Sequence, residues 1–85
     1  MFYVYILKSK RDKKLYFGYT NNLEKRLKEH NLGLVKSTMP RIPVYLVYYE
    51  AYASKQDAVR REHNLKLRAR ALRQLLNRIR TSLKA

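Results

Sequence analysis

With 85 residues the chain has room for one domain, and its 46% hydrophobic content is enough for one economical core. It contains no cysteine, which excludes a disulfide framework, a cysteine-ligated zinc site and thiol catalysis. The 20 Lys and Arg residues against 6 Asp and Glu residues give a net charge of +14, which favours binding to a polyanion such as DNA or RNA.

The segment Phe2 to Leu7 is the one apolar run near the N-terminus. No basic segment precedes it, and it is too short for the core of a signal peptide or for a membrane span. We therefore expect a soluble, cytoplasmic protein with no membrane partner. A single domain over residues 1–85 is expected to fold alone, and the oligomeric state stays open with a slight preference for the monomer.

Strand-like sequence occurs in three places. Residues 2–8 and 14–20 alternate on an aromatic and β-branched background, and the polar residues 9–13 between them predict a β-hairpin. Residues 44–51 are dense in Tyr and Val and predict a third strand, which we expect to be well buried.

The alternation in the hairpin assigns its two faces. If Tyr5 lies opposite Tyr16, both share one face with Gly18, while Val4 and Ile6 form the core face. A glycine inside a strand packs nothing and stiffens nothing. Gly18 therefore indicates that some group approaches the backbone closely at that position.

The first helix is predicted between the hairpin and the third strand. Asn21 or Asn22 is a suitable N-cap, and Gly33 is available just past the expected helix end near Asn31. Residues 31–43 contain this glycine and both prolines of the chain, and they predict a loop.

Two further helices are predicted after the third strand. Ser54 is a suitable N-cap for a helix over about residues 55–66. A last helix over about residues 69–83 is predicted from apolar residues at helical spacing, which are Leu72, Leu75, Leu76, Ile79 and Leu83. The chain is thus expected to be an α+β domain with a three-stranded sheet, flanking helices and the element order ββαβαα.

Glu62 lies on the inward side of its predicted helix, four residues after Ala58 and three before Leu65. A carboxylate there needs a cationic partner, because an unpaired buried charge is costly. A metal ion would serve, and so would an i,i+4 ion pair with Lys66. The spacing alone does not choose between them.

Two candidate phosphate-binding groups lie one turn apart on the first helix. Arg26 flanks the apolar Leu23 and Leu27, and His30 follows it. Together they could grip a phosphate. The simpler interpretation is a solvated arginine and a histidine whose positive charge is favourable at a helix C-terminus.

The two tyrosines of the hairpin complete a possible catalytic set. By themselves, tyrosines in strands are more often sheet packing than catalysis. Together with Arg26 and Glu62, Tyr5 and Tyr16 would supply what phosphodiester hydrolysis needs. The attacking water needs a base, the pentavalent phosphate needs positive charge, and the leaving oxygen needs a metal or an acid.

Other basic residues are candidate contacts to nucleic-acid phosphates. From residue 60 to the end of the chain there are nine Lys or Arg residues and one acidic residue. The positions expected to bind nucleic acid are Lys36, Arg41, Arg60, Lys66 and Arg70.

Four short motifs follow one another along the chain. They are Tyr3-Val4-Tyr5, Tyr16-Phe17-Gly18, the segment Asn22 to His30, and Ala58-Val59-Arg60-Arg61-Glu62 with Leu65-Lys66. Their order and placement resemble the GIY-YIG nuclease family, in particular its small standalone branch related to the nuclease domain of a DNA-repair excinuclease. The resemblance covers about residues 2–70.

The resemblance implies a role for each candidate residue. Tyr5 and Tyr16 match tyrosines that bind or activate the nucleophilic water in that family. Arg26 matches the arginine that stabilises the phosphate in the transition state, and Glu62 matches the sole carboxylate ligand of one Mg²⁺ or Mn²⁺ ion. His30 matches a position used as base or proton relay in some branches.

The implied function is a metal-dependent endonuclease or nickase, structure-selective or weakly specific, that acts on DNA rather than RNA, as in DNA repair. The alternative is a catalytically silent nucleic-acid-binding module on the same scaffold, anchored by its basic C-terminal helix. The chain departs from the family pattern where Tyr3 replaces Gly, where Phe17 replaces Ile, and over residues 67–85, which contain no Trp.

Overall fold

The computed structural model describes residues 1–84, which form a small α+β fold with a three-stranded antiparallel sheet and three α-helices. The predicted order ββαβαα is confirmed. In chain order the elements are β1 Phe2–Ser9, β2 Leu15–Thr20, α1 Leu23–Asn31, the 3₁₀ turn η1 Met39–Arg41, β3 Val44–Tyr52, α2 Lys55–Leu67, α3 Ala69–Arg78 and the 3₁₀ turn η2 Ser82–Lys84. Ala85 lies outside the described residues.

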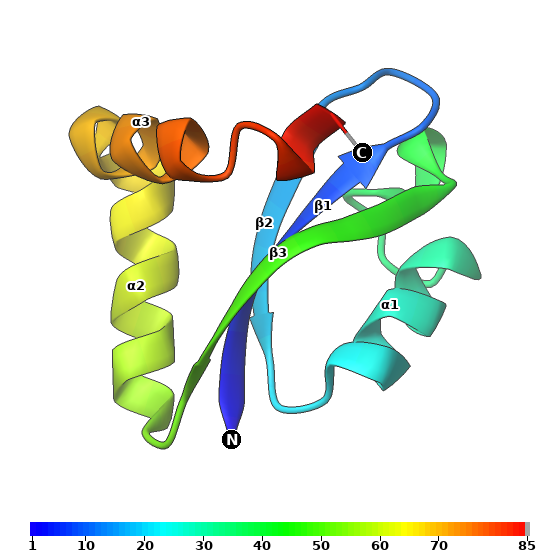
Figure 1. Cartoon of the computed structure of the whole chain (residues 1–85). Coiled ribbons are helices and arrows are strands. Elements are labelled where there is room, and N and C mark those ends of the chain that lie inside the picture. The colour runs from blue at the N-terminus through cyan, green and yellow to red at the C-terminus, as the bar shows by residue number, and fades with distance from the viewer. Residues whose placement is uncertain (85) are drawn as a thin grey trace.

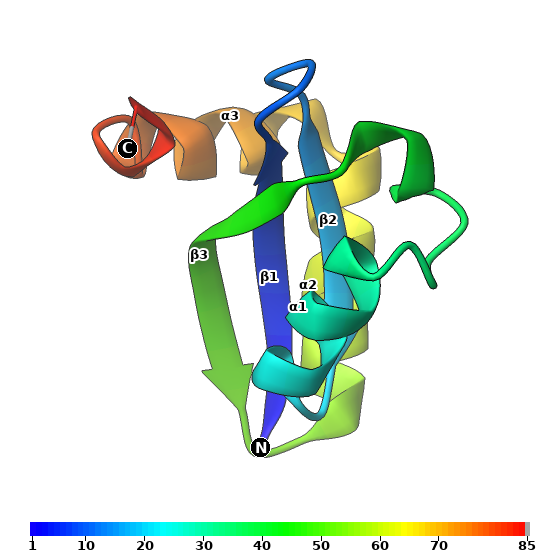
Figure 2. The same ribbon diagram turned by 90° about the vertical axis from the view of Figure 1, so that its right-hand side faces the viewer.

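The sheet is sandwiched between helices on both faces. Figure 1 shows α2 and α3 on one side of the strands and α1 on the other, and the rotated view in Figure 2 agrees. On the α2 and α3 side, Val4 and Ile6 pack with Leu65 and Leu75 in the main core. On the α1 side a smaller cluster is built on the buried Tyr5, Leu7 and Val44. The two faces predicted for the hairpin are therefore confirmed.

The register of the hairpin differs from the predicted one by two residues. Tyr5 pairs with Gly18, and Leu7 pairs with Tyr16, so the assumption that the two tyrosines face each other directly was wrong. The reason is the turn, in which the Ser9 hydroxyl accepts hydrogen bonds from two backbone amides and so shifts the turn toward β2. Because a shift of two residues preserves the alternation, the faces stay as predicted.

The third strand was expected to be well buried, and this expectation was wrong. β1 is the central strand, and β3 is an edge strand in which Val44 alone is fully buried. A density of Tyr and Val is equally compatible with an edge strand whose phenol rings reach water, so composition could not separate the two.

Asn22 caps α1 as predicted, with its side chain accepting a hydrogen bond from the Lys25 amide at 3.1 Å. Gly33 follows the helix with a φ of 78°, which suits a glycine. Ser54 precedes α2, but its side chain makes no capping hydrogen bond. α3 ends at Arg78 rather than near residue 83, because the chain turns back there.

Leu83 still reaches the core after this turn, where it packs against the main cluster. Its carbonyl accepts a hydrogen bond from Lys8 Nζ at 2.5 Å, which fastens the end of the chain to β1. No helix within residues 1–84 is long and apolar enough to span a membrane.

Glu50 of β3 fixes the position of α2. Its carboxylate accepts hydrogen bonds from the Tyr48 and Tyr52 hydroxyls and pairs with the Arg61 guanidinium at 3.0 Å. Although burial raises the pKa of Glu50, these donors hold it below its ordinary value, so the charged pair persists at neutral pH. This cluster ties the helix that carries Glu62 to the sheet.

Candidate active site

A buried hydrogen-bonded chain joins β1, α1 and the loop that follows α1. Tyr5 Oη lies 3.0 Å from His30 Nε2, and His30 Nδ1 lies 2.6 Å from Thr38 Oγ1. All three side chains are almost fully buried. Because buried polar groups must satisfy one another, this chain fixes the ring of His30 at both ends.

The direction of these hydrogen bonds follows from the last acceptor. The Thr38 hydroxyl lies 3.4 Å from the Val35 carbonyl oxygen, which can only accept. The single hydroxyl proton of Thr38 is therefore donated to Val35, and His30 Nδ1–H donates to Thr38. His30 Nε2 is left with its lone pair, and Tyr5 donates its phenolic proton to it.

His30 is neutral at physiological pH. Burial, followed by repulsion from the Arg26 guanidinium, lowers the pKa of His30 from 6.5 to about 4. The positive His30 expected at the helix C-terminus from the simpler sequence interpretation is therefore not what the structure shows. A neutral imidazole with a free Nε2 lone pair can accept a proton.

The low pKa of His30 makes the fold sensitive to acid. Above pH 6.5 the histidine is neutral in both the folded and the unfolded chain, and its full stabilising contribution is present. As the pH falls toward the folded pKa of about 4, the unfolded chain takes up the proton first, so stability is lost. We expect a loss of roughly 3 kcal/mol in the free energy of unfolding over this range.

Urea unfolding at several pH values measures this loss. His30→Gln should flatten the dependence between pH 6.5 and about 4.5, a range above most carboxylate titration. His63→Gln is the matched control, because His63 is exposed, and it should keep the slope of the parent. A His30→Gln variant with the parental slope would contradict the assigned pKa.

Gly18 makes room for Tyr5. A Cβ atom at position 18 would lie 2.5 Å from Tyr5 Oη and 2.6 Å from its Cζ, closer than real Cβ contacts occur. The phenol thus lies directly over the β2 backbone. The close approach predicted from a glycine inside a strand is confirmed, and the approaching group is the tyrosine itself.

Arg26 reaches the same hydroxyl from α1. Its guanidinium hydrogen-bonds Tyr5, which is the main reason that the pKa of Arg26 is raised. It also pairs with Glu29, with Nη1 to Oε1 at 3.2 Å. Burial raises the pKa of Tyr5, and the hydrogen bond with Arg26 offsets this only in part, so the phenol is protonated at neutral pH.

Tyr16 lines the same face. The centroid of its ring lies 5.1 Å from that of His30 and 6.5 Å from that of Tyr5. Tyr5, Tyr16, Arg26 and His30 therefore gather at one place, at the boundary between β2 and α1.

Glu62 approaches from α2. Its side chain is 14% exposed, and Oε2 lies 3.3 Å from Lys66 Nζ, so the ion pair considered from sequence is present. The Glu62 carboxylate also contributes to raising the pKa of Tyr5, which shows that it is electrostatically close to the phenol. Its role as a metal ligand stays a prediction. Within residues 1–84 no group of three or more His, Asp or Glu side chains is arranged to hold a metal ion.

The five basic positions expected to bind nucleic acid lie in different surroundings. Arg41 is engaged within the protein, with Nη2 donating to the Leu15 carbonyl at 3.1 Å and Nε 3.3 Å from Asp12. Arg60 pairs with Asp57 at 3.3 Å. Lys36 and Arg70 are exposed, and Lys66 pairs with Glu62.

Thr38 is the member of this site that the sequence interpretation missed. It lies in the loop between α1 and β3 and has no helix or strand pattern around it. The one available signal was indirect, because a histidine packed into the fold needs a partner at each ring nitrogen. Nothing in the spacing identified which residue supplies it.

The comparisons with known proteins agree with this geometry. Residues 1–77 match the sequence model of the GIY-YIG catalytic domain. The chain belongs to this family. In this GIY-YIG domain the matched region contains every residue of the cluster described above.

Similar proteins occur in bacteria and archaea. A UPF0213 protein of Clostridium perfringens is 55% identical over 67 residues, which are 78% of this chain and 71% of that protein. A UPF0213 protein of Natronomonas pharaonis is 47% identical over 75 residues, 87% of each chain. The solution NMR structure of a UPF0213 protein from Bacillus halodurans is 41% identical, with a TM-score of 0.55 over 91% of this chain and 84% of that one.

Proposed function

We propose that this GIY-YIG domain is a metal-dependent endonuclease or nickase that hydrolyses phosphodiester bonds in DNA, with structural selectivity or weak sequence specificity. The observation that carries the proposal is the contact of two groups with one buried phenol. The Tyr5 hydroxyl touches both the His30 Nε2 lone pair and the Arg26 guanidinium. Sheet packing alone needs neither of these groups.

Tyr5 and His30 form a proton relay in this proposal. A water held at Tyr5 attacks phosphorus and passes a proton to the Tyr5 oxygen, while Tyr5 passes its own proton to His30 Nε2. The P–O bond opposite the water breaks, and the leaving oxygen takes a proton from solvent. The phenol stays neutral throughout, which suits a tyrosine whose pKa is raised by burial.

Arg26 has two effects on this step. Its positive charge stabilises the negative charge that accumulates on the pentavalent phosphate. It also repels a proton from His30, which keeps the relay open in the free protein. A bound phosphodiester brings negative charge beside Arg26 and lessens this repulsion, so His30 becomes a better base when substrate is present.

Glu62 is the residue that would hold the metal ion. Its inward side chain, close to Tyr5 and paired with a lysine, fits a cation that keeps most of its water shell and is completed by phosphate oxygens. When bound, Mg²⁺ or Mn²⁺ would polarise the phosphate and stabilise the leaving oxygen. A single protein carboxylate implies weak metal binding in the absence of substrate.

A cleavage panel tests the proposal. Purified protein is incubated with branched, looped, nicked, single-stranded and linear duplex DNA in Mg²⁺, in Mn²⁺ or in EDTA. We expect cutting of at least one structured or single-stranded substrate with either metal and none in EDTA. Binding with a steep salt dependence but no cutting under any metal condition would instead support the silent binding module.

A further inference from the structure

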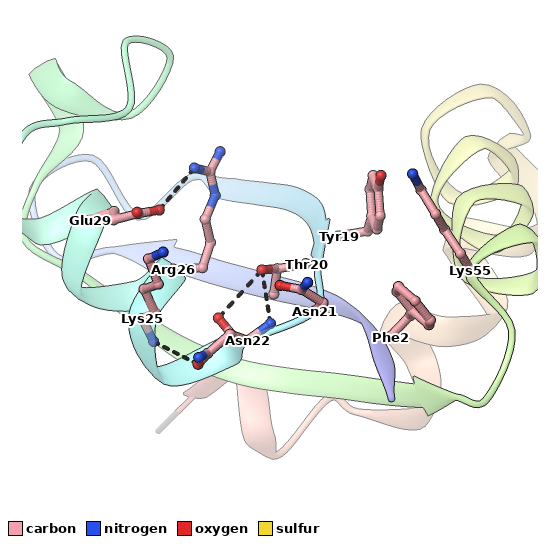
Figure 3. A pocket seen from close by; sticks show the side chains of 9 residues that line it. All are labelled: Phe2, Tyr19, Thr20, Asn21, Asn22, Lys25, Arg26, Glu29 and Lys55. Atoms are coloured by element: carbon pink, nitrogen blue, oxygen red, sulfur yellow. Dashed lines mark hydrogen bonds and ion pairs between the residues drawn. The ribbon is translucent and has the colours of Figure 1, made fainter.

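An open cavity of about 370 Å³ lies beside the site, between α1 and the start of α2. Figure 3 shows Arg26 and Lys25 on one side of it, Lys55 on the other, and Phe2 and Tyr19 between them. Its size falls at the lower end of the roughly 300–1,000 Å³ that small-ligand sites occupy. None of the candidate residues above lines it except Arg26.

The charge of the cavity suits an anion. Three cationic side chains line it, and the one carboxylate there, Glu29, is already paired with Arg26. Within residues 1–84, Lys25 and Lys55 make no ion pair with a carboxylate, although Glu24 and Asp57 lie close to them in sequence. Their ammonium groups are therefore available for phosphate oxygens.

The floor of the cavity suits a base. Phe2 and Tyr19 are half-buried, and both pack against the main core on their inner sides. Their rings are held by the fold and so lose little freedom when a ligand stacks on them. Base stacking on fixed aromatic rings is independent of base identity and contributes strongly to single-strand binding.

Arg26 connects the cavity to the reacting groups. Its side chain is 36% exposed, lines the cavity, and also hydrogen-bonds the Tyr5 hydroxyl. A strand whose scissile phosphate lies at Arg26 therefore has its adjacent nucleotide beside the cavity.

We propose that this cavity binds the nucleotide next to the scissile phosphate, with its base stacked on Phe2 and Tyr19 and its phosphate held by Lys25 and Lys55. A base inside a duplex presents no free ring face, so the cavity selects an unpaired nucleotide beside the cut. The proposal rests on the nuclease function above and specifies its substrate class: strands with a single-stranded or unstacked residue at the scissile bond.

Binding in EDTA tests the cavity without any cleavage. The probe is a fluorescein-labelled single-stranded oligodeoxynucleotide, and anisotropy is measured at several salt concentrations. Lys25→Ala/Lys55→Ala should weaken binding at least tenfold and reduce the slope of log K against log salt by about 1.4, or about 0.7 for each lost phosphate contact. Lys10→Ala/Lys84→Ala removes the same charge from exposed positions outside the cavity and should weaken binding less than about threefold.

Tyr19→Leu tests the stacking floor, with circular dichroism to confirm that it folds. It should weaken single-strand binding about tenfold and leave duplex binding unchanged. The proposal is overturned if the two double-lysine variants bind alike, because the loss is then one of general charge, or if Tyr19→Leu weakens both probes equally. If the cavity variants lose binding as expected while the parent cuts nothing in Mg²⁺, the nuclease function fails and the nucleotide site stands.

Discussion

Replacing Glu62 by Gln is expected to reduce the single-turnover cleavage rate on the order of 10³-fold while leaving DNA affinity nearly unchanged. The substitution keeps the shape of the side chain and removes the charge that would hold the metal ion. The ion pair with Lys66 is also lost, but that lysine is largely exposed, so little stability depends on it. Cleavage is measured across a Mg²⁺ titration, and affinity is measured in EDTA.

Glu24→Gln is the matched control for this prediction. It makes the same charge change on α1, where Glu24 is exposed and pairs loosely with Lys28 at 3.8 Å. Its cleavage rate should stay within about threefold of the parent, as for surface changes in general. Equal rates for the two variants would remove Glu62 from the mechanism.

Gly18→Ala is expected to damage the site through Tyr5 rather than through β2 itself. The added methyl group would lie 2.5 Å from the phenol oxygen, so the ring must move, and its hydrogen bond to His30 Nε2 is lost. We expect a loss of roughly 1–3 kcal/mol in stability from overpacking and a fall of about 10²-fold in cleavage from the misplaced hydroxyl.

Gly33→Ala separates these two effects. At a φ of 78° a Cβ is strained by roughly 1–2 kcal/mol, but its nearest neighbour is the Met39 side chain at 3.7 Å, away from Tyr5. This variant should lose comparable stability in urea unfolding and keep the cleavage rate of the parent while folded. If Gly18→Ala cuts as fast as Gly33→Ala, the position of the Tyr5 hydroxyl is unimportant for the reaction.

Local patterns carried most of the fold. The alternation of residues 2–8 and 14–20, the Asn22 cap and the helical spacing of Leu72, Leu75 and Ile79 predicted the elements, because each depends on neighbours in sequence. What depends on distant contacts was missed. The register of the hairpin follows from hydrogen bonds of the Ser9 side chain, and the edge position of β3 follows from the whole sheet.

The candidate site divides in the same way. Family resemblance selected Tyr5, Tyr16, Arg26, His30 and Glu62, whereas the residues alone left Glu62 undecided between a metal ligand and an ion pair. The burial that keeps His30 neutral and the contact of Thr38 with Nδ1 come from a loop with no sequence pattern. Arg41 was expected to bind nucleic acid, but its contacts to Leu15 and Asp12 hold the hairpin to that loop.

The common participation of the phenol and the carboxylate in one reaction is tested most directly by a double-mutant cycle of Tyr5→Phe and Glu62→Gln. Single-turnover cleavage is measured for the parent, both single variants and the double variant, with folding checked by circular dichroism. Groups that act on one phosphate are strongly non-additive, so the double variant should cut about as slowly as the slower single variant. Losses that multiply across the cycle, or single variants that cut like the parent, would show that Tyr5 and Glu62 do not form one active site.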